Sequence, residues 1–121
     1  TPRALLLHVS LATTAIAMTT AASRGFVYAA AVMGVTGARD TTSDLAAPLV
    51  ARTRATTDLP IGVGIGVSTR AQAAKVAGFA DGVIVGSALV RTLLEQPADR
   101  RAGLAALRAL TEELAAGVRG G

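Results

Sequence analysis

The sequence predicts an α/β fold in which parallel strands alternate with helices. The first observation is that short apolar runs alternate along the chain with longer amphipathic segments. The second is that these runs are almost continuously apolar, which is typical of strands buried on both faces of a parallel sheet. The third is the length of 121 residues, which fits one compact domain.

The predicted elements follow one another in βα units. Strands are predicted at residues 5–9, 26–32, 61–67 and 83–85. Helices are predicted at residues 41–57, 69–77, 88–95 and 104–118, with a further short helix before Gly25. Pro48 lies inside the first long segment, so that helix either starts near Ala47 or is kinked. Ser68 is the predicted N-cap of the next helix. One face of the last helix carries Leu104, Leu107, Leu110, Leu114 and Val118.

Composition excludes several classes of site. A hydrophobic share of 51% excludes an intrinsically disordered chain. Because the chain has no cysteine, a disulfide scaffold, a thiolate zinc site and a thiol nucleophile are excluded. His8 is the single histidine, so a metal site with several histidines is excluded too. We therefore expect no metal.

Charge and hydropathy give expectations about partners and location. The net charge is +4, but the basic residues are scattered and there are three aromatic residues, too few for a base-stacking platform. We therefore expect no nucleic-acid partner. Polar residues interrupt the apolar stretch at 5–22, which makes it a poor membrane span. A signal peptide is the alternative for this stretch, although its apolar core at 4–7 is short. The expected location is the cytoplasm, with no membrane association.

Three of the predicted strands end in glycine-bearing turns, at residues 34–37, 64–66 and 86–87. Ligands of parallel α/β proteins collect at the carboxyl ends of strands. Backbone N–H groups can converge on an anion there. A helix that begins just beyond Ser87 adds its positive N-terminal dipole, and the Ser87 hydroxyl adds a donor. The three turns therefore predict a phosphate site. The alternative is that they are ordinary connectors. The dinucleotide and Walker glycine motifs are both absent from the sequence.

Four segments of the chain share their order and spacing with one known family. They are residues 23–28 (SRGFVY), 33–39 (MGVTGAR), 60–67 (PIGVGIGV) and 81–90 (DGVIVGSALV). Together they resemble the second half of a tryptophan synthase alpha chain. The resemblance covers residues 21–121. Residues 1–20 diverge from the family pattern and are expected to form a strand and a loop.

The resemblance implies a fold and an activity. The fold is a (β/α)8 TIM barrel of the ribulose-phosphate-binding type, of which this chain would hold about four C-terminal βα units. The activity is that of a carbon–carbon lyase of tryptophan biosynthesis, the aldol cleavage of indole-3-glycerol phosphate to indole and glyceraldehyde 3-phosphate. The alpha chain uses no cofactor of its own. Its partner is a beta chain, which holds pyridoxal phosphate, in an alpha2beta2 assembly.

The resemblance also assigns site residues by motif position. The positions that match the family's substrate-phosphate contacts are Gly37, Ile65, Gly66, Gly86 and Ser87. Tyr28 and Thr36 match the wall of the active site, and residues 37–40 begin a loop that closes over substrate. No catalytic residue is assigned, because the family's catalytic glutamate and aspartate lie in its first half.

Two function classes therefore remain open. In the first, the chain is a fragment of the lyase and is inactive alone, because phosphate anchoring without acid–base groups does not cleave the substrate. In the second, it is a non-catalytic half-barrel that binds a phosphate ligand. Other phosphate-binding barrels, such as indole-glycerol-phosphate synthase or a phosphoribosyl isomerase, fit less well, because Tyr28 precedes the turn at 34–37.

Overall fold

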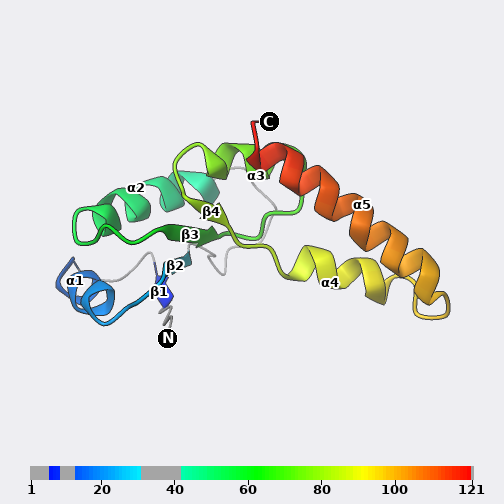
Figure 1. The fold of residues 1–121 in the computed structure, drawn as a ribbon, viewed down its shortest axis with the longest axis horizontal. Helices are drawn as coiled ribbons and strands as arrows, with labels where there is room; N and C mark the ends of the chain where they lie inside the picture. Colours follow the sequence, from blue (N-terminus) through cyan, green and yellow to red (C-terminus); the bar gives the residue numbers. More distant parts are fainter. Residues whose placement is uncertain (1–5, 9–12, 31–41, 121) are drawn as a thin grey trace.

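The computed structural model describes residues 6–8, 13–30 and 42–120. Within these ranges one parallel sheet of four strands is flanked by helices (Figure 1). The strands are β1 (Leu6–His8), β2 (Val27–Ala30), β3 (Ile61–Gly64) and β4 (Gly82–Val83), and they are neighbours in chain order. The predicted α/β class with a parallel sheet is therefore confirmed. A run of parallel strands in chain order is also the arrangement found in a (β/α)8 barrel.

β3 and β4 are shorter than the apolar runs that predicted them. β3 ends at Gly64 because the backbone turns at Gly66, whose φ of +82° is incompatible with an extended strand. β4 comprises Gly82 and Val83, and thus starts earlier and ends earlier than predicted. The last two residues of the predicted strand 26–32 lie outside the described residues.

The helices are α1 (Thr13–Ala21), α2 (Thr42–Arg54), α3 (Arg70–Ala77), α4 (Ser87–Leu94) and α5 (Arg100–Val118). α2 continues through Pro48, so the predicted alternative start near Ala47 is wrong. The predicted cap Ser68 is also wrong. Thr69 is the N-cap of α3, because its hydroxyl accepts from the backbone N–H of Gln72 while the Gln72 side chain accepts from the N–H of Thr69.

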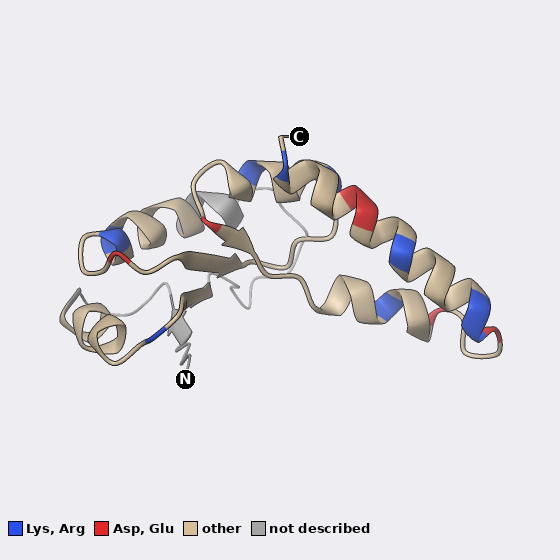
Figure 2. Ribbon diagram, viewed as in Figure 1, with Lys and Arg blue, Asp and Glu red and all other residues tan. Residues whose placement is uncertain are grey.

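α5 begins earlier than predicted because an acidic residue caps it. The Asp99 carboxylate accepts a hydrogen bond of 3.0 Å from the backbone N–H of Ala102. α5 packs against α3 and α4, and the pair α4–α5 extends away from the sheet (Figure 1). As a result Leu114 is buried, whereas Leu104 and Val118, from the same predicted face, are exposed. Positions of charged residues are distributed along the α5 ribbon (Figure 2).

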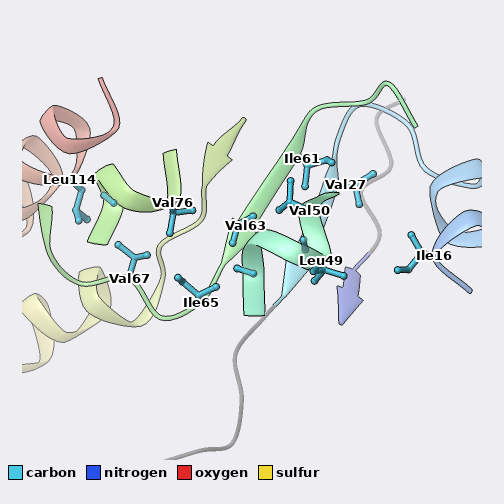
Figure 3. Packing of buried hydrophobic residues seen from close by; sticks show 13 residues of the cluster. Ile16, Val27, Leu49, Val50, Ile61, Val63, Ile65, Val67, Val76 and Leu114 are labelled. Atoms are coloured by element: carbon cyan, nitrogen blue, oxygen red, sulfur yellow. The ribbon is translucent and has the colours of Figure 1, made fainter. Parts of the chain in front are cut away.

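The core lies on one face of the sheet, between the strands and α2 and α3 (Figure 3). Side chains alternate across a strand, so every second residue of β2 and β3 points into this layer. Its fully buried members include Val27, Leu49, Ile61, Val63 and Val76. Each contributes about 1.5–3 kcal/mol through burial of apolar surface. The other face of the same strands carries Tyr28, Gly62 and Gly64.

An open apolar hollow of about 390 Å³ lies between β4 and the helices α3, α4 and α5. Its walls include Ala73, Val83, Val85, Leu89 and Leu114. It belongs to the helix-covered side of the sheet, because Val83 is paired with the core residue Val63. In the described part of the chain, no helix combines the length and apolar character that a membrane span requires.

Candidate phosphate site at the carboxyl ends of β3 and β4

The loop after β3 exposes a glycine next to a buried anchor. Ile65 is 8% exposed and belongs to the core cluster, which fixes the start of the loop. Gly66 follows with a φ of +82°, a backbone conformation that residues with a Cβ rarely adopt. A Cβ built on Gly66 would meet no atom of the described residues within 4 Å. The predicted phosphate contacts Ile65 and Gly66 thus lie in a turn that is anchored by burial of Ile65 and exposed at Gly66.

The loop after β4 leads directly into a helix. Gly86 is the N-cap of α4 and Ser87 is its first residue, and both are exposed. No side chain caps this helix among the described residues. A Cβ on Gly86 would also lie more than 4 Å from every atom in the part of the chain that the structure describes. The first turn of α4 therefore offers N–H groups, the Ser87 hydroxyl and the positive end of the helix dipole to solvent.

The two loops leave the sheet side by side. Val63 of β3 is paired with Val83 of β4, and the N–H of Ile84 donates to the carbonyl of Val63 at 2.8 Å. Gly66 and Gly86 each lie three residues beyond this pair, on neighbouring parallel strands. Because the strands are parallel, both glycine-bearing loops leave the sheet at the edge formed by the carboxyl ends. Two predicted site residues, Thr36 and Gly37, lie outside the described residues, as does the loop at 37–40.

Tyr28 lies on β2, on the sheet face opposite the core. Its register partner on β3 is Gly62, which has no side chain to occupy the space above it. The ring reaches beyond this partner to Gly64, the last residue of β3. The aromatic side chain is half-buried and leans toward the loop that carries Ile65 and Gly66.

The amino ends of the same strands carry a different arrangement, which sequence reasoning missed. Asp81 immediately precedes β4. Its carboxylate accepts a hydrogen bond of 2.8 Å from the N–H of Ile61 and another of 3.0 Å from the Arg54 guanidinium. The backbone N–H of Ile61, and then the hydrogen bond from Arg54, lower the pKa of Asp81 below its ordinary value of 3.8. Arg54 also donates to the carbonyl of Phe79.

Comparison with known proteins identifies the family. The family model described as tryptophan synthase alpha chain matches residues 4–119. The chain belongs to this family. The match begins at residue 4, and so includes the first strand and helix as well as the four segments that carried the resemblance. Among similar proteins, the tryptophan synthase alpha chain of Streptomyces avermitilis is 63% identical over 106 residues, which are 88% of this chain. That of Mycobacterium avium is 62% identical over 104 residues, or 86% of this chain.

The solved structures agree with this assignment. Tryptophan synthase from M. tuberculosis superposes with a TM-score of 0.81 and 51% identity, and the match covers 99% of this chain and 41% of that chain. A tryptophan synthase alpha subunit from Pyrococcus furiosus, 28% identical, gives a TM-score of 0.73 over 95% of this chain and 45% of that chain. The chain spans 38% and 36% of the length of its Streptomyces and Mycobacterium relatives. The fold is therefore part of a (β/α)8 barrel, as predicted.

Proposed function

We propose that this member of the tryptophan synthase alpha chain family supplies the phosphate-binding part of a lyase site. The reaction is the aldol cleavage of indole-3-glycerol phosphate to indole and glyceraldehyde 3-phosphate, a step of tryptophan biosynthesis. One observation carries the proposal beyond family membership. The loops that carry Gly66 and Gly86 leave the same edge of the sheet from neighbouring strands, and no side chain of the described residues fills the space beside either glycine.

The chemistry of these loops suits a phosphate group. A phosphate needs several donors at once, and glycine lets backbone N–H groups approach it without a Cβ in the way. The uncapped start of α4 adds its dipole, and the Ser87 hydroxyl adds a donor. In (β/α)8 barrels, loops that follow the last strands recurrently form such a site. Burial of Ile65 in the core holds the turn in place. Gly37, in the loop after β2, is proposed to donate a further backbone hydrogen bond to the phosphate.

Tyr28 and Thr36 are proposed to form the wall of the cavity in which the rest of the substrate lies. Tyr28 leans from β2 across β3 toward the phosphate loop, so its ring lies next to the group that the phosphate anchors. An aromatic ring offers a large apolar surface that suits the indole part of the substrate, and a hydroxyl that suits its polar part.

The acid–base groups of the reaction are proposed to come from the part of the family barrel that this chain does not match. Cleavage of the carbon–carbon bond requires one proton to reach the indole ring and another to leave a glycerol hydroxyl. Asp81 does not suit either role, because it lies at the amino end of β4, where the Ile61 N–H and Arg54 occupy its carboxylate. Binding of the phosphate alone leaves the bond intact, so the 121-residue chain is expected to be inactive by itself.

The remaining proposals follow the family. The partner is a tryptophan synthase beta chain in an alpha2beta2 assembly, and the beta chain holds the pyridoxal phosphate. The alpha chain takes no cofactor or metal. The proposed location is the cytoplasm, with no nucleic-acid or membrane partner.

An indole-release assay tests the proposal. The chain is compared alone with a chimera in which it replaces the matching segment of the S. avermitilis alpha chain, to which it is 63% identical. We expect indole release from the chimera and none from the chain alone. A folded chimera that binds glyceraldehyde 3-phosphate without releasing indole would favour the alternative, a non-catalytic phosphate-binding half-barrel. Indole release by the chain alone would contradict the proposal that the acid–base groups come from the part of the barrel that this chain does not match.

A further inference from the structure

The loop after β3 is held in the core on both sides of its exposed glycine. Ile65 is 8% exposed and Val67 is 3% exposed, and both belong to the core cluster (Figure 3). Gly66 lies between them, is exposed and has a φ of +82°. Because glycine adopts many backbone conformations at little cost, the conformation of Gly66 depends on how its neighbours are held. The contacts of the residues that follow Val67 therefore matter for the proposed phosphate turn.

One side chain collects the donors that follow Val67. Oε1 of Gln72 accepts a hydrogen bond of 2.8 Å from the backbone N–H of Ser68 and one of 3.2 Å from the N–H of Thr69. The Ser68 hydroxyl donates to the same oxygen at 3.3 Å. A carbonyl oxygen has two lone pairs, so these donors use its full capacity. Gln72 thus reaches back from the first turn of α3 and ties the end of the loop to the helix.

α3 is a firm base for this tie. Ala73 and Val76 on its inner face are fully buried. Its first residue, Arg70, lies so close to α5 that a Cβ built on Gly117 would overlap the Arg70 carbonyl oxygen. Because the two backbones touch, α3 cannot shift toward α5. A loop that is tied to α3 is therefore tied to an element whose position is set by the core.

The starts of α3 and α4 differ in the donors that they leave for an anion. No side chain of the described residues caps α4, so its first N–H groups are open. At α3, the Thr69 hydroxyl accepts from the N–H of Gln72, while Oε1 of Gln72 occupies the N–H groups of Ser68 and Thr69. Open backbone N–H groups at a helix start attract anions. Gln72 thus withdraws the donors beside α3 and leaves the start of α4 available.

We propose that Gln72 is a positioning residue for the substrate phosphate, whose carboxamide oxygen fixes the end of the loop at 65–69 and so holds the backbone of Gly66 in its phosphate-binding conformation. The effect on the substrate rests on the proposed function, whereas the contacts of Gln72 with the loop do not. Gln72 acts through Ser68 and Thr69 and does not itself touch the phosphate. Without its oxygen, binding of the phosphate has to order the loop as well.

The two halves of the α3 cap separate this role from a merely structural one. Gln72→Met keeps the length of the side chain and removes the oxygen that the loop donates to. Thr69→Ala is the matched control, because it removes the hydroxyl that accepts from the N–H of Gln72 but leaves the Gln72 oxygen in place. Each variant loses part of the same helix cap, so we expect each to lower the melting temperature of the 121-residue chain by about 4 °C.

Amide hydrogen exchange of the 121-residue chain, followed by NMR, tests the loop contacts without any substrate. In Gln72→Met we expect the Ser68 amide to exchange about fivefold faster, the usual worth of one hydrogen bond. In Thr69→Ala the Ser68 amide should keep its rate, while the Gln72 amide exchanges faster. An unchanged Ser68 rate in Gln72→Met, or equal acceleration in both variants, would overturn the proposal.

Gln72→Glu provides a second variant in case Gln72→Met does not fold. Glutamate keeps an acceptor oxygen at the same position of a capping box, and its charge strengthens the hydrogen bond. We therefore expect the Ser68 amide to exchange more slowly than in the unmodified chain. Faster exchange in Gln72→Glu would show that the side chain at position 72 does not hold the loop.

The same substitutions in the S. avermitilis chimera test the consequence for the substrate. Gln72→Met is expected to raise the KM for indole-3-glycerol phosphate about tenfold and to leave kcat within about twofold, since the lost contact serves binding rather than proton transfer. Thr69→Ala is expected to leave both constants within about twofold. Equal effects of the two variants on KM would contradict the role of Gln72. If the unsubstituted chimera releases no indole, the proposed function fails, and the exchange result alone decides whether Gln72 holds the loop.

Discussion

The two ends of β3 and β4 differ in how their polar groups are satisfied. At the amino ends, the Asp81 carboxylate joins the backbone N–H of Ile61 to the guanidinium of Arg54, so three segments of the chain are tied together. At the carboxyl ends, Gly66 and Gly86 are exposed, and within residues 6–8, 13–30 and 42–120 no side chain fills the space beside them. One pair of strands thus has a closed end and an open end. This division matches the general behaviour of (β/α)8 barrels, whose amino face stabilises the fold and whose carboxyl face carries the site.

The largest expected effect comes from a negative charge at the open end. Gly86→Asp in the S. avermitilis chimera would set a carboxylate against the substrate phosphate. We expect KM for indole-3-glycerol phosphate to rise by at least about 100-fold, since opposed like charges cost several kcal/mol. Among the described residues, no atom lies within 4 Å of a Cβ at position 86, so the new side chain has room there.

Gly86→Asn is the neutral control of nearly equal size. We expect it to raise KM far less than the aspartate, and to give the same melting temperature. If aspartate and asparagine had equal effects, charge would not be the reason, and a phosphate at the start of α4 would be refuted.

A smaller effect is expected at the closed end. Asp81→Ala leaves the N–H of Ile61 without its acceptor and should lower the free energy of unfolding by about 1–2 kcal/mol. This value is toward the low end of the cost of an unsatisfied buried donor, because the carboxylate is partly exposed. Urea unfolding of the chain measures this change. Asp81→Asn keeps an oxygen for Ile61 and should lose less. In the chimera, kcat should be unchanged by either substitution. A fall in kcat would contradict the assignment of a purely stabilising role to the amino end.

The smallest effect concerns pH. Because folding lowers the pKa of Asp81, the folded chain binds fewer protons at this group than the unfolded chain does near pH 3.8. The stabilisation is therefore fully present above pH 3.8 and is lost as the pH falls through the folded pKa. We expect the stability gap between the unmodified chain and Asp81→Asn, at most about 1 kcal/mol for so exposed a group, to narrow below pH 3.8. A gap that widens on acidification would contradict this account.

Much of the fold was predictable because it depends on local patterns. The apolar runs located the core strands, and the glycine after each run located the turns, since both signals act over a few residues. The ends of elements were less predictable. Ser68 and Thr69 are both good capping residues, and the choice of Thr69 depends on the side chain of Gln72 reaching back to it. Leu104 and Leu114 share one helical face, but α3 covers Leu114 and nothing described covers Leu104 to the same extent.

The candidate site likewise has features that local sequence patterns predict and features that depend on residues distant in the chain. The sequence located the glycines that are proposed to contact the phosphate, because glycine after an apolar run is a local turn signal. The sequence did not reveal that Tyr28 covers Gly64, because the two residues lie on different strands. The role of Asp81 was missed, because its partners Ile61 and Arg54 are 20 and 27 residues away.

The sequence by itself determined the family, the α/β class and the residues at the strand ends, because short motifs and their spacing are enough to identify these properties. The tertiary structure alone decided which of those residues meet. Sheet register brings the turns after β3 and β4 to one edge, and it lays Tyr28 over Gly64. Register is a pairing of segments distant in the chain, and it is selected by the burial of Val27, Ile61 and Val63 against the helices.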